Sequence, residues 1–91
     1  MRRFRSPMSP AYNARAMVTS RLDAKGLVCP LPVLRARKAL KALRQGDILE
    51  IEATDPASVR DFAAFCDMTG STLLESTDKS GVFRFRIRKE E

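Results

Sequence analysis

The feature that most constrains this 91-residue chain is the tetrapeptide Cys29-Pro30-Leu31-Pro32, which stands directly before a run of helix-forming residues. Proline is accepted in the first turn of a helix, because the N–H that it lacks would have no partner within the helix there. Two prolines one residue apart therefore predict a helix that begins at Pro30 and runs to about Leu43. Cys29 is then expected at the N-cap position or just before it.

This position of Cys29 predicts chemistry at its sulfur. A thiol at a helix start lies at the positive end of the helix dipole, beside backbone N–H groups that have no helical partner. Such surroundings favour the thiolate, which is the form that attacks or carries sulfur. The alternative is that Cys29 is a small buried hydrophobic residue next to the cap. Because the chain contains no histidine, Ser-His-Asp and Cys-His catalysis are excluded, and only backbone dipoles and basic neighbours would activate Cys29.

Size and composition limit the class of protein. A chain of this length forms one small domain with a single core. No apolar run approaches the roughly 20 residues that span a bilayer, so no membrane contact is expected. The two cysteines lie 37 positions apart, which favours a reducing compartment and a cytoplasmic location over a secreted disulfide scaffold. Two cysteines without histidine also make a poor zinc site, and neither a metal nor another cofactor is expected.

The net charge of +6 is unevenly distributed along the chain. Residues 1–16 hold four arginines and no acid, whereas the other 75 residues hold 13 basic and 11 acidic side chains. The first segment also contains two prolines and lacks apolar periodicity. We therefore expect a disordered basic extension over residues 1–18 and a folded domain over residues 19–90. A dispensable tail, or a true start at Met17, is favoured over a targeting segment.

The domain shows six elements in the order β-α-β-α-β-β. Strands are predicted over residues 19–23, 47–53, 71–77 and 82–88, with a hairpin loop over residues 78–81. In the first helix, the apolar residues recur at helical spacing: Val33, Ala36, Leu40 and Leu43. A second helix is expected to start with Asp55 as N-cap and Pro56 in its first turn, and to end at Gly70. Its predicted core stripe consists of Val59, Phe62, Ala63 and Cys66, which makes Cys66 structural.

This order predicts an α/β (α+β) fold, a two-layer sandwich in which two helices pack on one face of a four-stranded mixed sheet. Three layers would require more helices than the chain contains. The pattern by itself leaves the order of the strands in the sheet open.

From about Leu22 to Lys89 the chain resembles the TusA/SirA-like family of sulfur-carrier proteins. The matching residues are Leu22-Asp23, Gly26, the Cys-Pro-x-Pro element, Pro32-Val33, Arg37-Lys38, Gly46-Asp47, Asp55-Pro56, Asp61, Phe65-Cys66 and Phe85-Arg86-Ile87-Arg88-Lys89. The resemblance implies that Cys29 carries sulfur as a persulfide. The motif and helix start around it comprise Asp23, Gly26, Pro30, Leu31 and Pro32.

The resemblance also implies partners. A cysteine desulfurase or a rhodanese-type protein would load Cys29, and an acceptor protein would take the sulfur onward. The pathway would be tRNA thiolation, molybdenum-cofactor metabolism or sulfur oxidation, and tRNA would be involved only indirectly. We expect Arg37, Lys38 and Asp55 to contribute to partner binding. Leu31 occupies a position where some members carry an acid, so the identity of the partner stays open.

Two other classes of function are considered. One is an RNA-binding module that uses the basic face of Arg37, Lys38 and Lys41. Such a face normally has aromatic stacking residues beside it, and here the phenylalanines fall mostly in core elements. A solvated helix surface explains these basic residues equally well. The other class is a redox switch with a disulfide between Cys29 and Cys66. Placing one cysteine at a cap and the other in a core stripe argues against this, because the two Cα atoms must approach within about 7 Å.

Overall fold

Residues 18–90 are described by the computed structural model of the chain. They form six elements in the predicted order: β1 (Thr19–Ala24), α1 (Leu31–Lys41), β2 (Ile48–Ala53), α2 (Ala57–Thr69), β3 (Thr72–Lys79) and β4 (Val82–Arg88). The prediction of a disordered extension, and that of a start at Met17, concern residues that lie outside the described part, apart from Val18. Neither of the two helices in residues 18–90 is long and apolar enough to cross a membrane.

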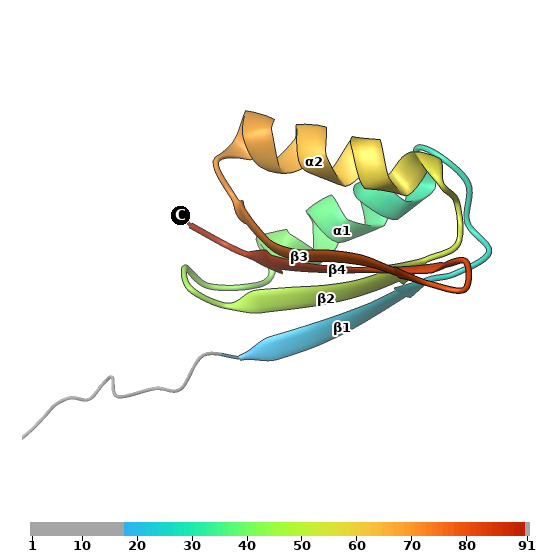
Figure 1. The fold of residues 1–91 in the computed structure, drawn as a ribbon. Coiled ribbons are helices and arrows are strands. Elements are labelled where there is room, and N and C mark those ends of the chain that lie inside the picture. The colour runs from blue at the N-terminus through green and yellow to red at the C-terminus, as the bar shows by residue number, and fades with distance from the viewer. Residues whose placement is uncertain (1–17, 91) are drawn as a thin grey trace, which may run out of the picture.

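The four strands form one mixed sheet in the order β1-β2-β4-β3. β1 pairs with β2 in parallel, and β4 lies antiparallel to both β2 and β3. Both helices cover the same face of this sheet, which leaves the opposite face uncovered (Figure 1). The predicted two-layer sandwich is confirmed, and the structure supplies the strand order that the sequence pattern left open.

Helix α1 packs on the sheet through the predicted apolar stripe. Ala36 and Leu40 are buried in the core, and Val33 and Leu43 pack against it. The helix ends at Lys41, two residues before the expected end. The amine of Lys89 donates hydrogen bonds of 2.8 Å to the carbonyl oxygens of both Leu40 and Leu43. A cation at this end supplies further donors to the last carbonyl groups and opposes the negative end of the dipole.

Helix α2 packs through a different line of residues from the one predicted. Phe62 and Cys66 are buried as expected, but Val59 is 42% exposed and Ala63 is also exposed. Ser58 is buried in their place. Residues 58, 62 and 66 follow each other at spacings of four, so the buried line lies to one side of the predicted stripe. The prediction was wrong here because it selected apolar residues at helical spacing, whereas the packing of Phe62 on Phe85 sets which line of residues faces the sheet.

Both ends of α2 have a local cause in the sequence. The helix begins at Ala57 rather than at Pro56, and Oδ1 of Asp55 accepts the Ala57 N–H at 3.0 Å. Asp55 therefore caps the helix start, although the N-cap position itself is occupied by Pro56. Gly70 ends the helix with a φ of 77°, and its N–H donates to the carbonyl oxygen of Cys66. This left-handed conformation is favoured by glycine.

The core joins α2 to the centre of the sheet. The rings of Phe62 and Phe85 lie with centroids 4.6 Å apart and planes inclined by 36°. Leu49, Ile51 and Ile87 are buried around them. These aliphatic residues alternate along β2 and β4 with charged residues, so the pleat directs one set to the helices and the other to the uncovered face.

The β3–β4 hairpin has a tighter turn than the predicted loop over residues 78–81. β3 extends to Lys79, and only Ser80 and Gly81 connect the strands. Both residues have positive φ, 54° and 87°, as a two-residue hairpin turn with the twist of the strands requires. Oδ1 of Asp78 accepts the Gly81 N–H at 3.0 Å and holds the turn.

We expect Ser58→Ala to raise the free energy of unfolding by about 0.5–1.5 kcal/mol, as measured by urea denaturation. The Ser58 hydroxyl is buried and has no hydrogen-bond partner within residues 18–90. Alanine removes this desolvated group and favours the helix. Ser76→Ala, at an exposed strand position, serves as control and should change stability by less than about 0.5 kcal/mol. A loss of stability in Ser58→Ala would show that the hydroxyl is hydrogen-bonded in solution.

Candidate functional site

Cys29 lies in the loop between β1 and α1, immediately before the N-cap residue Pro30. The peptide bond between these two residues is cis. The thiol is exposed, which excludes the alternative of a buried hydrophobic residue beside the cap. The two prolines thus place an accessible sulfur at the start of a helix, as the sequence predicts.

Two carboxylates from the region of α2 hold Cys29. The backbone N–H of Cys29 donates to Oδ2 of Asp55 at 2.7 Å, and the thiol donates to Oδ2 of Asp61 at 2.8 Å. Asp55 accepts the Ala57 N–H through its other oxygen, so one carboxylate connects the cysteine loop to the start of α2. These contacts join residues 26 and 32 positions apart in the chain. The site is therefore assembled from the beginnings of both helices.

The predicted effect of the helix start on Cys29 is wrong. The pKa of the Cys29 thiol is raised above its ordinary value, chiefly by its hydrogen bond to Asp61. Partial desolvation and the negative charges of Asp61 and Asp55 act in the same direction, and only Arg60 opposes them. A carboxylate beside a thiol disfavours the second negative charge that the thiolate would carry. The free protein therefore holds Cys29 mainly as a thiol.

The backbone around the motif explains why the helix dipole does not prevail. Pro30 and Pro32 have no N–H, and the Leu31 N–H donates to the carbonyl oxygen of Val28 at 2.9 Å. The Leu34 N–H bonds to the carbonyl oxygen of Pro30, as in an ordinary first turn. Pro30 and Pro32 thus offer no donor and the N–H groups of Leu31 and Leu34 are already used, whereas the Asp61 carboxylate contacts the sulfur directly.

The other predicted motif residues support the loop and do not contact the sulfur. Gly26 has a φ of 83°, and its N–H donates to Oγ1 of Thr54 at 3.0 Å. Asp23 accepts the Lys25 N–H and forms an ion pair with the Lys25 amine at 3.2 Å. These two hydrogen bonds with Lys25 lower the pKa of Asp23. Pro32 is a buried residue of the first turn of α1.

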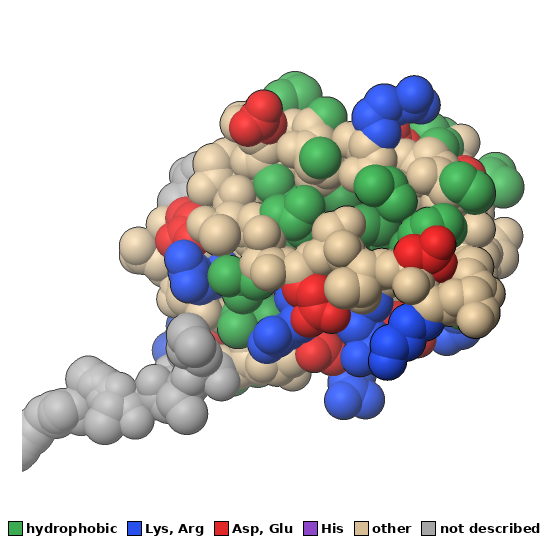
Figure 2. All heavy atoms as spheres, viewed as in Figure 1, with side chains coloured by type: hydrophobic (Ala, Val, Ile, Leu, Met, Phe, Trp, Pro, Cys, Tyr) green, Lys and Arg blue, Asp and Glu red, His purple; other side chains and the backbone are tan. Residues whose placement is uncertain are grey.

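Apolar side chains flank the cysteine on the surface. Val28 is 64% exposed, Leu31 is 41% exposed and Leu34 is 51% exposed. Val59, on the first turn of α2, adds another exposed apolar side chain. Figure 2 shows hydrophobic side chains gathered over the helical layer, where a few charged side chains also lie, while more of the charged side chains in this view lie along the sheet side. The surroundings of Cys29 therefore combine two carboxylates with an apolar rim.

The predicted basic residues lie further along α1. Arg37 and Lys38 are exposed, and neither contacts Cys29. Arg37 lines a hollow of about 360 Å³ between the helices, together with Leu40, Lys41, Phe65, Thr69, Ser71 and Lys89. Lys38 lies outside this hollow. The structure thus groups Asp55 with Cys29 and separates Arg37 and Lys38 from both.

Cys66 differs from Cys29 in its burial, which decides whether a thiol can reach a partner. Its side chain is 5% exposed and packs in the core. Burial raises the pKa of the Cys66 thiol to about 11, with a smaller contribution from Asp67. Both cysteines are free thiols. A thiol that is buried and protonated neither attacks sulfur nor accepts it.

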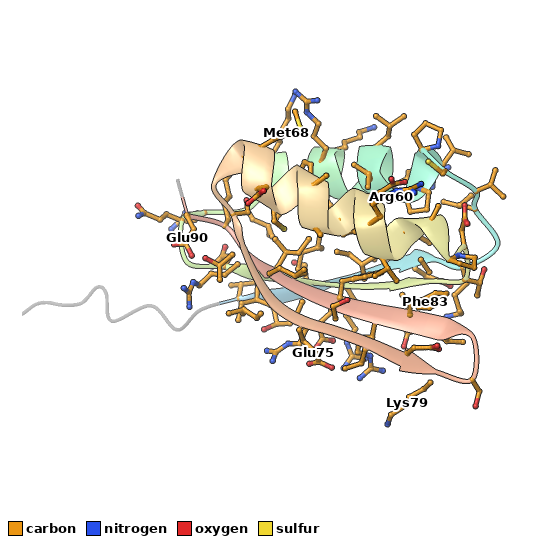
Figure 3. All side chains as sticks on the ribbon, turned by 45° about the horizontal axis from the view of Figure 1, so that its top comes forward. Arg60, Met68, Glu75, Lys79, Phe83 and Glu90 are labelled. Atoms are coloured by element: carbon orange, nitrogen blue, oxygen red, sulfur yellow. The ribbon has the colours of Figure 1, made fainter. Side chains whose placement is uncertain are left out.

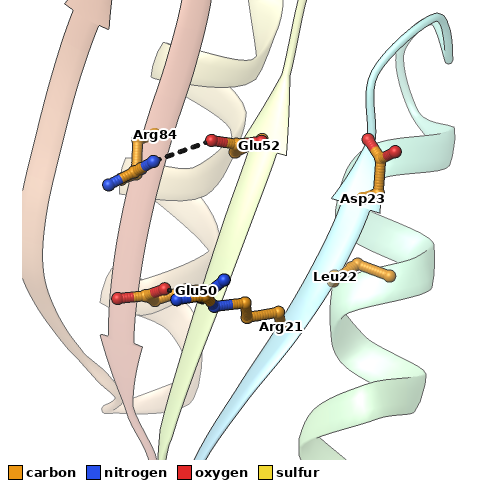
Figure 4. Close-up of a pocket in the computed structure, with 6 residues that line it drawn as sticks. All are labelled: Arg21, Leu22, Asp23, Glu50, Glu52 and Arg84. Atoms are coloured by element: carbon orange, nitrogen blue, oxygen red, sulfur yellow. Dashed lines mark hydrogen bonds and ion pairs between the residues drawn. The ribbon is translucent and has the colours of Figure 1, made fainter.

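The uncovered face of the sheet carries a network of ion pairs and is a less suitable site. A hollow of about 150 Å³ lies there, lined by Arg21, Leu22, Asp23, Glu50, Glu52 and Arg84 (Figure 4). Glu52 pairs with Arg84 at 2.9 Å, and Glu50 pairs with Arg21 at 3.3 Å. Opposite charges facing each other across strands stabilise a sheet surface. Within residues 18–90, no three His, Cys, Asp or Glu side chains gather so as to hold a metal ion.

The fold and the site define a class of protein, a small two-layer α/β sandwich that presents one cysteine at a helix start. The sequence model of the family described as sulfurtransferase TusA matches residues 20–89. The chain belongs to this TusA family. It is 54% identical over 68 residues to the sulfur carrier protein TusA of Allochromatium vinosum, covering 75% of this chain and 90% of that protein.

Two further proteins show how broadly the similarity extends. A putative sulfur carrier protein of Neisseria meningitidis is 51% identical over 72 residues, which cover 79% of this chain and 97% of that protein. The crystal structure of a SirA-like protein from Desulfitobacterium hafniense superimposes with a TM-score of 0.68 at 31% identity. That match covers 82% of this chain and 100% of the other. The family resemblance inferred from the sequence is confirmed.

Asp61 is the residue of the site whose role sequence reasoning missed. It entered only as one of the residues that resemble the family, with no part assigned to it. A carboxylate at the start of the second helix is the only signal in the sequence, and it does not identify the sulfur as its partner. The packing of α2 beside the first turn of α1 creates this contact.

Proposed function

We propose that this protein is a sulfur carrier that accepts sulfur as a persulfide on Cys29 and passes it to an acceptor protein. The observation that carries the proposal is that Cys29 presents an exposed sulfur at the start of α1, while Cys66 is buried. Membership of the TusA family supports it, and so do relatives that are named as sulfur carriers. The proposed donor is a cysteine desulfurase or a rhodanese-type protein.

The transfer requires two exchanges at one sulfur. The thiolate of Cys29 attacks the outer sulfur of the donor persulfide, a new S–S bond forms, and the donor's inner sulfur leaves as a thiolate. In the second exchange an acceptor thiolate attacks the outer sulfur on Cys29, which regains its thiol after protonation. Both exchanges require access from outside, and the exposed position of Cys29 provides it.

The apolar rim of Cys29 is suited to a partner that covers it. Leu31 and Leu34 stand on the first turn of α1 with about half of their side-chain surface in solvent. Burying them in a complex contributes favourable free energy and excludes water from the sulfur. We propose that donor and acceptor proteins dock on this rim in turn. We also place the protein in the cytoplasm, in tRNA thiolation, molybdenum-cofactor metabolism or sulfur oxidation, with tRNA reached only through the acceptor.

Mass spectrometry after incubation with a cysteine desulfurase and cysteine tests the proposal. A gain of one sulfur atom on the peptide that contains Cys29 is the expected result. The loss of two hydrogens, with Cys29 and Cys66 in one cross-linked peptide, would indicate a redox switch. No change in mass with desulfurase and rhodanese-type donors would contradict the carrier function and return attention to RNA binding.

The structure disfavours the two alternative functions. A disulfide requires Cys66 to leave the core in which it packs. RNA binding through α1 requires exposed aromatic rings, but Phe62 and Phe85 are buried, and Phe65 and Phe83 are partly buried against the core. Among residues 18–90 the surface therefore lacks the stacking platform that usually accompanies a basic RNA-binding face.

Reversing the charge of Arg37 is expected to slow association with an acidic partner by about twofold to tenfold at low salt and to flatten the salt dependence. Arg37 lies eight residues beyond Cys29, roughly 12 Å along the helix axis, and is exposed. Stopped-flow loading of Arg37→Glu by a desulfurase measures the effect. Lys79→Glu, at the β3–β4 hairpin in the sheet layer rather than on α1 (Figure 3), makes the same change in net charge and serves as control.

Alkylation of Cys29 by a small reagent shows whether Arg37 acts on the partner or on the reactivity of the sulfur. It should be nearly unchanged in Arg37→Glu, since solvent and salt screen an exposed charge at that distance. If alkylation slowed as much as loading, the docking role of Arg37 would be contradicted.

A further inference from the structure

The sulfur of Cys29 is hydrogen-bonded to a carboxylate, which determines where its hydrogen lies. The distance from Sγ to Oδ2 of Asp61 is 2.8 Å. An ionised carboxylate only accepts hydrogen bonds, so the hydrogen of this pair is held by the sulfur. The cysteine backbone is anchored independently, through its N–H and Asp55. The side chain is thus directed toward α2 by one contact, and that contact exists only while the sulfur carries a hydrogen.

We propose that Asp61 is a positioning residue for Cys29, which holds the unloaded cysteine as a neutral thiol and disfavours the persulfide. This inference rests on the proposed function, because only a sulfur carrier alternates between these two forms. Beyond the carrier role itself, the inference is that Asp61 influences the direction of sulfur transfer by favouring the unloaded cysteine.

The charges that face Cys29 are predominantly negative. Asp61 and Arg60 come from α2, and Asp55 comes from the segment that precedes it. Helix α1 contributes no charge in its first turn, which consists of residues 31–34 and is apolar apart from its backbone. The two carboxylates therefore exceed the single cation, and both raise the pKa of the Cys29 thiol. The hydrogen bond to Asp61 and the surrounding negative charge both favour the protonated thiol of Cys29.

Loading with sulfur removes the hydrogen bond and replaces it with repulsion. In a persulfide, the inner sulfur of Cys29 is bonded to the outer sulfur and no longer bears a hydrogen. A persulfide ionises more readily than a thiol, so its negative charge would lie beside the Asp61 carboxylate. Two like charges at this separation disfavour each other. The loaded cysteine is then expected to turn away from Asp61 toward solvent or a docked acceptor.

The hydrogen bond in the unloaded state and the repulsion in the loaded state both shift the equilibrium of sulfur exchange. The exchange is balanced in atoms and charges. The persulfide anion on Cys29 and a free thiol are converted into the Cys29 thiol and a persulfide anion on the other molecule. One S–S bond breaks and one forms, and one proton moves to Cys29. Only the product side contains the hydrogen bond from Cys29 to Asp61. Asp61 therefore favours unloading, whichever thiol takes the sulfur.

The pH dependence of Cys29 alkylation in Asp61→Asn tests whether the Asp61 carboxylate keeps Cys29 protonated. Removing the charge should lower the midpoint of the iodoacetamide profile by about half a unit to one unit. One unit raises the thiolate fraction at neutral pH about tenfold, and the accompanying loss of nucleophilicity reduces the net gain in rate to about threefold. Peptide mass spectrometry follows Cys29 separately from Cys66, in the full chain.

Two variants make this readout specific. Asp61→Glu keeps the carboxylate and should keep a midpoint near that of the unaltered protein. Asp67→Asn removes a charge from the same helix, at a residue that acts on Cys66 rather than on Cys29, and should leave the profile unchanged. A purely structural role of Asp61 would not shift a titration midpoint. An unshifted midpoint in folded Asp61→Asn would overturn the proposal.

The equilibrium of sulfur exchange tests the bias toward unloading. Protein loaded by a desulfurase is equilibrated with glutathione under anaerobic conditions, and the loaded fraction is measured by intact mass. Asp61→Asn should shift this equilibrium about threefold to tenfold toward the loaded protein, because half a unit to one unit of pKa at Cys29 corresponds to that range. An equal or lower loaded fraction would overturn the inference. Failure of the unaltered protein to load would instead contradict the proposed function, and the alkylation profile would still decide whether Asp61 holds the thiol.

Discussion

Cys29→Ser is expected to abolish sulfur loading and leave the fold unchanged. A serine oxygen forms no persulfide, so the mass gain seen after incubation with a donor should fall below detection. The side chain is exposed, and the hydrogen bond from its backbone N–H to Asp55 does not depend on the sulfur. The free energy of unfolding should therefore change by less than about 0.5 kcal/mol. Intact-mass measurement and urea denaturation of the same sample check both parts.

Cys66→Ser is the matched variant, with the opposite expectation. It places a hydroxyl at a position that is 5% exposed and surrounded by the core, which should cost about 1–3 kcal/mol. Loading should be retained in the folded fraction. If Cys66→Ser lost loading while Cys29→Ser kept it, the roles assigned to the two cysteines would be reversed.

Phe62→Ala is expected to destabilise the domain by about 3–5 kcal/mol. The Phe62 side chain is fully buried and stacks on Phe85 at the centre of the interface between α2 and the sheet. A domain of this size has a total stability of about 5–10 kcal/mol, so the loss removes a large part of it. The melting temperature, followed by circular dichroism, should fall sharply, and the loop of Cys29 should lose its anchor on α2.

Met68→Ala is the control on the same helix. Met68 is 86% exposed and points away from the sheet (Figure 3), so its truncation should change stability by less than about 0.5 kcal/mol. Comparable losses in the two variants would contradict the packing of α2 through Phe62.

Local rules in the sequence were sufficient for the elements and their order. The proline spacing in Cys29-Pro30-Leu31-Pro32 predicted the start of α1, because proline is restricted in the same way wherever it occurs. Alternation of apolar and charged residues predicted β2 and β4, since a strand directs successive side chains to opposite faces. With two helices and four strands, a single sheet covered on one side was the arrangement that buries the apolar surface.

The same rules were less accurate in predicting which side of a helix packs on the sheet. In α2, Val59 and Ala63 belonged to the predicted core stripe, yet the structure leaves both exposed and buries Ser58. Helical spacing shows that several residues share a side of the helix, but the angle at which the helix meets the sheet selects among them. That angle follows from the packing of Phe62 on Phe85, two residues that lie 23 positions apart in the chain.

By itself the sequence determined that this protein has a cysteine at a helix start within a two-layer sandwich, because capping and periodicity act over a few residues. Only the tertiary structure decided that this cysteine is exposed and what its electrostatic state is. The dipole of α1 is a local property and predicted a thiolate, whereas Asp61 approaches the sulfur from an element 32 positions away and favours the thiol. A charge in direct contact outweighs a partial charge spread over a helix end, and which charges come into contact is decided when the helices pack.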